Sequence, residues 1–150
     1  MINIALYKPD IPQNTAAIIR LGACLGLKIH IIEPCGFNIN DKRFQRVVMD
    51  YLNLCSINRY RDYDSFKKSF VGSRIILLTT KSKKSFQRFK FKKNDVLLFG
   101  SESKGVPKQI HKKVDFRLRI PMQEKVRSLN ISMAVAIVSS ENIRQNNLFK

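Results

Sequence analysis

The chain has 150 residues, the size of a single domain, and 44% of them are hydrophobic, which excludes a chain that is disordered throughout. It carries 28 Lys and Arg against 11 Asp and Glu, a formal net charge of +17, and such an excess favours a nucleic-acid partner over an anionic membrane surface. Three cysteines without C-x-x-C spacing, and no apolar run near the ~20 residues of a spanning helix, exclude a disulfide framework and a membrane span, and we expect a cytoplasmic protein.

The first half of the chain alternates predicted strands and helices. Ile2, Ile4 and Leu6 alternate with other residues, which predicts a strand that ends at Lys8 and Pro9. A helix is predicted from Pro12 near its start to Gly26 near its end. The pattern then predicts a strand at 29–33, a short helix at 41–49, a strand at 54–60 and a helix at 64–70.

The second half continues this alternation. A continuous apolar run, residues 75–78, predicts a strand at 74–80 that is covered on both faces, and further strands are predicted at 95–99 and 116–120. Val135 and Val138 lie at helical spacing in a C-terminal helix that begins at Ile131. The order predicts an α/β fold, a mostly parallel sheet with helices on both faces, and residues 1–150 form one domain without a linker.

Three loops are candidates for a binding site. In an open parallel sheet, ligands bind beyond the carboxyl ends of the strands. This rule selects the loops that follow Leu78, Phe99 and Ile120.

The common short motifs do not define a chemistry for these loops. The segment 100–105 is followed by Val106 and Pro107 rather than by the Lys-Ser/Thr of a P-loop, and no G-x-G-x-x-G or G-x-S-x-G is present. His30 and His111 have no partners at metal-ligand spacing, so no metal site is predicted. Taken singly, Gly100 is either a turn residue or a point of close backbone approach, and Ser128 or Asn130 is either a helix cap or a site residue.

Taken in order, the motifs resemble the SPOUT superfamily of RNA methyltransferases, and in particular its enzymes that modify the wobble-position ribose of tRNA. The resemblance covers nearly the whole chain and is carried by residues 3–7, 9–15, 18–21, 30–34, 36–37, 41–43, 78–81, 99–102, 105–107, 120–122, 127–132 and 134–135.

The resemblance implies a fold, a cofactor and a reaction. The fold would be a single SPOUT domain with a C-terminal trefoil knot, although chains almost never thread their own loops. S-Adenosylmethionine would bind in the knot loops, at Leu78, Gly100, Ile120 and Ser128, without a metal. The enzyme would transfer its methyl group to the 2′-hydroxyl of cytidine or uridine at the wobble position of tRNA, leucine tRNAs among them, bound by the anticodon stem-loop.

By the same resemblance, Arg20 has a catalytic role and acts across the interface of a homodimer. A guanidinium stays protonated, so we expect Arg20 to hold a phosphate and position the ribose rather than to act as the base. Asn14, Glu102 and Asn130 are expected to orient groups in the site.

Two alternatives remain beside this interpretation: a non-catalytic RNA-binding module, and a SPOUT enzyme that acts on ribosomal RNA. The chain also departs from the family's pattern at Met133 and Ser140, where relatives carry a polar residue and a tyrosine, and this affects the expected dimer contact and RNA grip. The basic segment 81–93, which contains three phenylalanines, is either a grip on the anticodon stem or a solvated loop.

Overall fold

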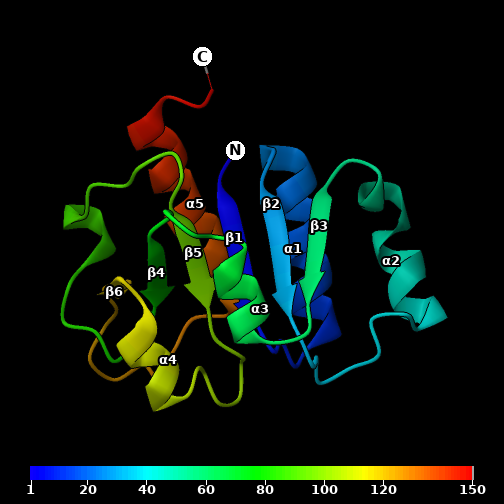
Figure 1. The fold of residues 1–150 in the computed structure, drawn as a ribbon, viewed down its shortest axis with the longest axis horizontal. Helices are drawn as coiled ribbons and strands as arrows, with labels where there is room; N and C mark the ends of the chain where they lie inside the picture. The colour runs from blue at the N-terminus through cyan, green and yellow to red at the C-terminus, as the bar shows by residue number, and fades with distance from the viewer. Residues whose placement is uncertain (150) are drawn as a thin grey trace.

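Residues 1–149 are described by the computed structural model, and their six strands form one parallel sheet of order β3-β2-β1-β5-β4-β6 (Figure 1). The strands are β1 (Asn3–Tyr7), β2 (Lys28–Ile32), β3 (Ser56–Tyr60), β4 (Ile75–Leu78), β5 (Val96–Phe99) and β6 (Phe116–Leu118). The helices are α1 (Pro12–Leu25), α2 (Lys42–Leu52), α3 (Tyr63–Lys68), α4 (Lys108–Lys113), α5 (Ile131–Asn146) and the short 3-10 helix η1 (Phe86–Arg88). The predicted fold class is confirmed, and the sheet is parallel throughout.

Helices cover both faces of this sheet, as the alternation predicted. One buried cluster joins Ile4 and Leu6 of β1 to apolar residues of α1, α2 and α5. A second joins Ala5 and Tyr7 of the same strand to residues of α3 and α4. Successive side chains of a strand point to opposite faces, so a strand with helices on both sides is apolar at every position.

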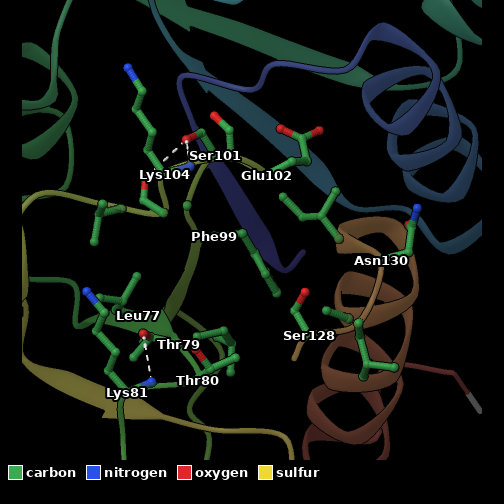
Figure 2. Close-up of a pocket in the computed structure, with 18 of the residues that line it drawn as sticks. Leu77, Thr79, Thr80, Lys81, Phe99, Ser101, Glu102, Lys104, Ser128 and Asn130 are labelled. Atoms are coloured by element: carbon green, nitrogen blue, oxygen red, sulfur yellow. Dashed lines mark hydrogen bonds between the residues drawn. The ribbon is translucent and has the colours of Figure 1, made fainter. Parts of the chain in front are cut away.

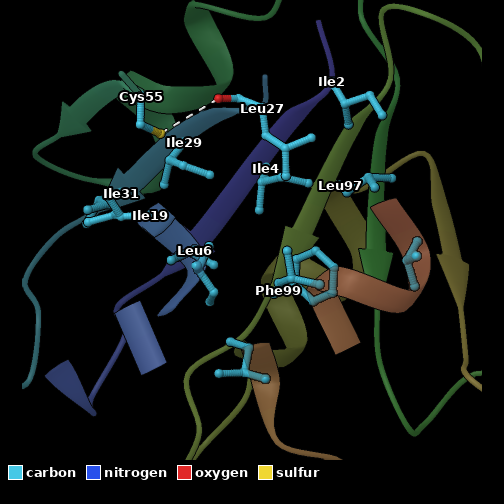
Figure 3. Packing of buried hydrophobic residues seen from close by; sticks show 14 of the residues in the cluster. Ile2, Ile4, Leu6, Ile19, Leu27, Ile29, Ile31, Cys55, Leu97 and Phe99 are labelled. Atoms are coloured by element: carbon cyan, nitrogen blue, oxygen red, sulfur yellow. Dashed lines mark hydrogen bonds between the residues drawn. The ribbon is translucent and has the colours of Figure 1, made fainter. Parts of the chain in front are cut away.

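The core is densest around the central strands. Ile4 pairs in register with Ile29 on one side and Leu97 on the other, and all three side chains are fully buried. Figure 3 shows these residues side by side with Leu6 and Phe99 on the α1 and α5 face. Burying each such side chain contributes about 1.5–3 kcal/mol.

The predicted limits of α1 hold because its end residues suit their places. Pro12 occupies the first turn, where the missing N–H costs nothing. Gly26 ends the helix in the left-handed region at φ 61°, and its N–H donates to the carbonyl of Gly22.

Elsewhere the observed elements differ from the predicted ones at their ends. The strand predicted at 54–60 begins only at Ser56, because the N–H groups of Leu54 and Cys55 both donate to Tyr51 in the turn that ends α2. The strands predicted at 74–80 and 116–120 end at Leu78 and Leu118. Helix α4 and η1 were not predicted: α4 buries a single residue, Ile110, and so shows no apolar stripe, and η1 has only three residues.

The strand order brings three carboxyl ends to one edge. β5 lies between β1 and β4, and β6 lies outside β4, so the chain reverses its direction across the sheet beside β1. Ligands bind at such a switch point in open parallel sheets. Within the described residues, no helix has both the length and the apolar character to cross a bilayer.

His30 on β2 is a buried titratable group on the α3 face. Its Nε2–H donates to the Asn3 carboxamide oxygen at 3.1 Å, and its Nδ1 lies 3.2 Å from the Tyr60 hydroxyl oxygen. The ring meets Phe70 edge-on, with centroids 4.9 Å apart. Burial, helped by the charge of Lys28, lowers the pKa of His30 to about 4.

This shift predicts a loss of stability in mild acid. Between pH 6.5 and about 4 the unfolded chain binds a proton at His30 that the folded chain does not, so the free energy of unfolding falls as pH falls through this window. The full effect is up to about 3 kcal/mol. Urea unfolding of the wild type and of His30→Gln from pH 7.5 to 4 checks this, because the variant should lack this part of the pH dependence.

His111→Gln is the matched control. His111 is only partly buried, and burial, followed by the charges of Lys81 and Arg117, lowers its pKa. Replacing His111 should reduce the pH dependence of the free energy of unfolding less than replacing His30 does. An identical pH dependence in His30→Gln and the wild type would contradict the assignment.

Candidate functional site

A cavity of about 540 Å³ opens at the carboxyl ends of β4, β5 and β6. Its walls are the loops that follow these three strands, together with the first turns of α1 and α5. Figure 2 shows Thr79, Thr80 and Lys81 on one side, Ser128 and Asn130 on the other, and Phe99 between them. The volume falls within the ~300–1,000 Å³ of small-molecule sites.

The structure brings seven of the eight predicted site residues to this cavity. Those predicted to bind the cofactor are Leu78, Gly100, Ile120 and Ser128, and all four line it. The residues predicted to orient groups, Asn14, Glu102 and Asn130, line it as well. Arg20 is the eighth and is not part of the lining.

Gly100 is a point of close backbone approach. A Cβ at this position would lie 2.6 Å from both Cα and the carbonyl carbon of Gly105, and 3.0 Å from the amide nitrogen of Val106. These are backbone atoms, which cannot rotate away. Of the two interpretations of Gly100 that the sequence left open, the structure selects the close approach.

The loop that follows Gly100 is a closed turn. The N–H of Ser101 donates to the carbonyl of Gly105 at 3.1 Å, and the N–H of Gly105 donates to the carbonyl of Ser101 at 2.8 Å. Gly105 closes the turn at φ 65°, a left-handed conformation that glycine adopts without strain. The turn fixes the direction in which the side chain between these residues, Glu102, points.

Glu102 fastens this loop to the start of α1. Its carboxylate accepts from the N–H of Asp10 at 2.8 Å, from the N–H of Ile11 at 3.3 Å and from the amide of Asn14 at 3.2 Å. Asp10 returns the contact, because its carboxylate accepts from the N–H and the hydroxyl of Ser103. These bonds from Ser103 lower the pKa of Asp10. A carboxylate next to the amino end of a helix is also favoured by the helix dipole.

The same chain of hydrogen bonds reaches α5. The amide of Asn130 donates to the side-chain oxygen of Asn14 at 2.9 Å. The oxygen of Asn130 in turn accepts from the N–H of Ser132 at 2.8 Å and so caps α5. Asn130 therefore has both roles that the sequence left open: it caps the helix and lines the cavity. The polar wall of the cavity joins three segments that are far apart in sequence.

The inner wall is apolar and the rim is basic. Leu77, Leu78, Phe99 and Ile120 contribute hydrocarbon surface, whereas the rim carries the cations Lys81, Lys104 and Arg127. His111 also lines the cavity, with its pKa lowered as described above. Sequence reasoning missed this residue because it missed α4, although Pro107, directly before the helix, is a recognised signal for a helix start.

Arg20 lies on the exposed face of α1. Its guanidinium carbon is 5.4 Å from the centroid of the Tyr51 ring, on the terminal part of α2. The side chain therefore lies against α2 and does not reach the cavity lining.

The comparison with protein families matches residues 1–140 to the SpoU rRNA Methylase family. The chain therefore belongs to the SpoU methylase family. It is 43% identical over 144 residues to a tRNA (cytidine(34)-2′-O)-methyltransferase of Beijerinckia indica, covering 95% of this chain and 90% of that protein. It is 41% identical over 147 residues to the protein of the same name from Escherichia coli K12, covering 97% and 94%.

Solved structures give the same result for the fold. One, described as "Structural insights into the 2-OH methylation of C/U34 on tRNA", superposes with a TM-score of 0.91 at 33% identity and covers 97% of this chain and 95% of its own. The SpoU methyltransferase AviRb of Streptomyces viridochromogenes, solved with AdoMet, superposes with a TM-score of 0.86 at 20% identity. This chain spans 57% of AviRb, and at that identity the likeness shows the shared fold.

Proposed function

We propose that this protein transfers a methyl group from S-adenosylmethionine to the ribose 2′-hydroxyl of cytidine or uridine 34, the wobble nucleotide of tRNA, leucine tRNAs among them. The observation that carries the proposal is the near full-length identity of 41–43% to proteins that bear this activity in their names. The cavity at the carboxyl edge supplies a place for the methyl donor, and we expect the protein to work in the cytoplasm.

The residues of the cavity fit this donor. Gly100 lets the backbone of Gly105 close against it, which shapes the loop that lines the cavity, and Leu78 and Ile120 offer an apolar slot for a planar base. Ser128 stands beside the capped start of α5. When bound, the donor supplies an electrophilic methyl group on a positive sulfonium. Glu102, Asn14 and Asn130 hold the walls at a fixed separation, which positions the donor.

We assign to Arg20 the role of positioning the substrate ribose. A guanidinium binds phosphate with a planar pair of donors, so Arg20 would hold the phosphate next to nucleotide 34 and align its 2′-hydroxyl for attack. The proton of the hydroxyl would leave late, to solvent, because the guanidinium does not accept it.

In a homodimer, Arg20 of one chain could reach the cavity of the other chain. Arg20 is exposed on α1, and the neighbouring helix α5 exposes two apolar side chains one turn apart, Met133 at 58% and Ile137 at 40%. Ser140 continues the same exposed stripe. We propose that a second copy covers this surface and that Arg20 of each chain serves the cavity of the other. We further propose that the segment between β6 and α5 threads the chain into a trefoil knot.

Mass spectrometry of nucleosides tests the function. tRNA from cells that lack the gene should gain 2′-O-methylcytidine or 2′-O-methyluridine at position 34 after incubation with the protein and labelled donor. Ribosomal RNA incubated in parallel should gain none. Methylation of ribosomal RNA alone would reassign the substrate, and donor binding without methylation of either RNA would reduce the protein to an RNA-binding module.

A further inference from the structure

Residues 81–93, here called the basic strap, carry seven lysines and arginines and no acidic residue. All seven side chains are exposed: Lys81, Lys83, Lys84, Arg88, Lys90, Lys92 and Lys93. Among residues 1–149, no carboxylate lies within ion-pair distance of any of them. Like charges held so close together repel one another, and a bound anion would relieve this repulsion.

The strap has a fixed inner side. Phe86 and Phe91 are buried at 5% and 4% exposure, and Phe89 packs between Phe91 and Phe116 with ring centroids 5.1 and 5.0 Å away. The aromatic side chains therefore face the protein, while the cations between them face solvent. A merely solvated loop would not bury its aromatic residues in this regular way.

Hydrogen bonds pin the backbone of the strap at both ends. The N–H of Arg119, just after β6, donates to the carbonyl of Lys84, and the N–H of Phe86 donates to the carbonyl of Arg119. At the other end Gln145 of α5 accepts from the N–H of Phe91 at 2.9 Å and donates to the carbonyl of Phe89 at 3.0 Å.

An ion pair between half-buried Arg74 and buried Asp95 completes the framework. Arg74 donates to both oxygens of Asp95, at 2.7 and 2.6 Å, and also to the carbonyl of Lys90 at 3.1 Å. Its guanidinium carbon also lies 5.2 Å from the ring centroids of Phe89 and Phe116. Asp95, only 1% exposed, accepts from the N–H of Lys92 at 2.7 Å as well. Arg74 thus already neutralises Asp95.

The strap begins at the cavity. Lys81 lines the cavity at the carboxyl end of β4, and the chain then runs along the outer edge of the sheet to the amino end of β5 (Figure 1). Arg117, exposed on the edge strand β6, adds a further cation beside it. A polyanion with one residue in the cavity would therefore meet the strap as it leaves.

We propose that the basic strap is a preformed docking surface for the phosphate backbone of the substrate RNA beyond the methylated nucleotide. This inference rests on the proposed function for the identity of the RNA. Phosphate contacts need positive charge and a fixed register rather than base recognition, and the pinned strap offers both. An anionic membrane is disfavoured, because surface binding to lipid uses exposed apolar side chains and the strap turns its aromatic residues inward.

A charge-neutralising variant tests the strap. Lys83→Gln, Lys84→Gln and Arg88→Gln remove three cations whose side chains lie outside the cavity lining. Binding of an anticodon stem-loop RNA should weaken ~10-fold or more at 0.1 M salt, and the slope of log K against log salt should fall by about 2–3. In methylation assays the loss should appear in KM for the RNA rather than in kcat, and calorimetry should give unchanged affinity for S-adenosylmethionine.

The matched control removes the same charge elsewhere. Lys42→Gln, Arg46→Gln and Lys68→Gln neutralise three exposed cations on α2 and α3. RNA affinity and salt slope should then stay close to those of the wild type. Equal losses of RNA affinity in the two triple variants would contradict the proposed docking surface, because the effect would then depend on net charge alone. Loss of binding to phosphatidylserine vesicles with unchanged RNA binding would also overturn it and assign the strap to a membrane.

These outcomes are separable from failure of the proposed function. If the wild type methylates no tRNA, but the strap variant binds the stem-loop more weakly than the wild type, the docking surface is supported and the proposed enzymatic function is refuted. If the wild type methylates nucleotide 34, and the strap variant has the same KM for the RNA and the same salt slope, the enzymatic function is supported and the docking surface is refuted.

Discussion

Gly100→Ala is expected to abolish most of the affinity for S-adenosylmethionine. The added methyl group would meet backbone atoms of Gly105 at 2.6 Å, so the turn from Ser101 to Gly105 must move. That turn carries Glu102, which ties the cavity to α1, so the displacement reaches the opposite wall. A misplacement of ~1 Å in such a site costs about 100-fold in rate, so the loss of donor affinity should be accompanied by a loss of activity of that order. Calorimetric titration with the donor measures the loss directly.

The control for this variant is Gly72→Ala. Gly72 has φ 84° and nothing within 4 Å of an added Cβ, so the substitution strains the backbone without a clash, in the turn before β4 and outside the cavity lining. It should cost stability of about 1–2 kcal/mol and leave the affinity for the donor intact. Wild-type affinity in a folded Gly100→Ala protein would show that the donor does not bind against this loop.

Arg20→Ala is expected to remove catalysis while sparing the cofactor. Arg20 lies outside the cavity of its own chain, so calorimetry should find donor affinity unchanged. Loss of a positioned charge in the reacting complex typically lowers kcat by about 10²–10³. Arg20→Lys should recover only part of the rate, because an ammonium keeps the charge but lacks the planar pair of donors. Single-turnover methylation of tRNA measures both rates.

Mixed dimers test whether Arg20 acts across the interface. A chain with Arg20→Ala and a chain with Gly100→Ala are each inactive by themselves in this scheme. A heterodimer of the two contains one cavity with an intact loop that faces an intact Arg20, and it should regain activity. Purified heterodimers without activity would place Arg20 in the site of its own chain, or outside catalysis altogether.

The sequence alone was enough to predict where the six strands lie along the chain, that the sheet is mostly parallel, and at which edge of the sheet the cavity lies. Apolar runs such as residues 75–78 identify strands covered on both faces, and the carboxyl-end rule then selects the loops after Leu78, Phe99 and Ile120. Local signals were sufficient because each depends on neighbours within a few residues. Helix α4 was missed, since a short helix with one buried residue shows no apolar stripe, and His111 was missed with it.

Only the tertiary structure decided what the ambiguous polar residues do. Glu102 and Asn14 are 88 positions apart and Asn14 and Asn130 are 116 apart, yet they form one hydrogen-bonded wall. The same holds for the basic strap: its charge is evident in the sequence, but its order depends on Arg74, Phe116 and Gln145, which lie outside it. Composition records charge and hydrophobicity, whereas the direction in which a side chain points is fixed by contacts between distant parts of the chain.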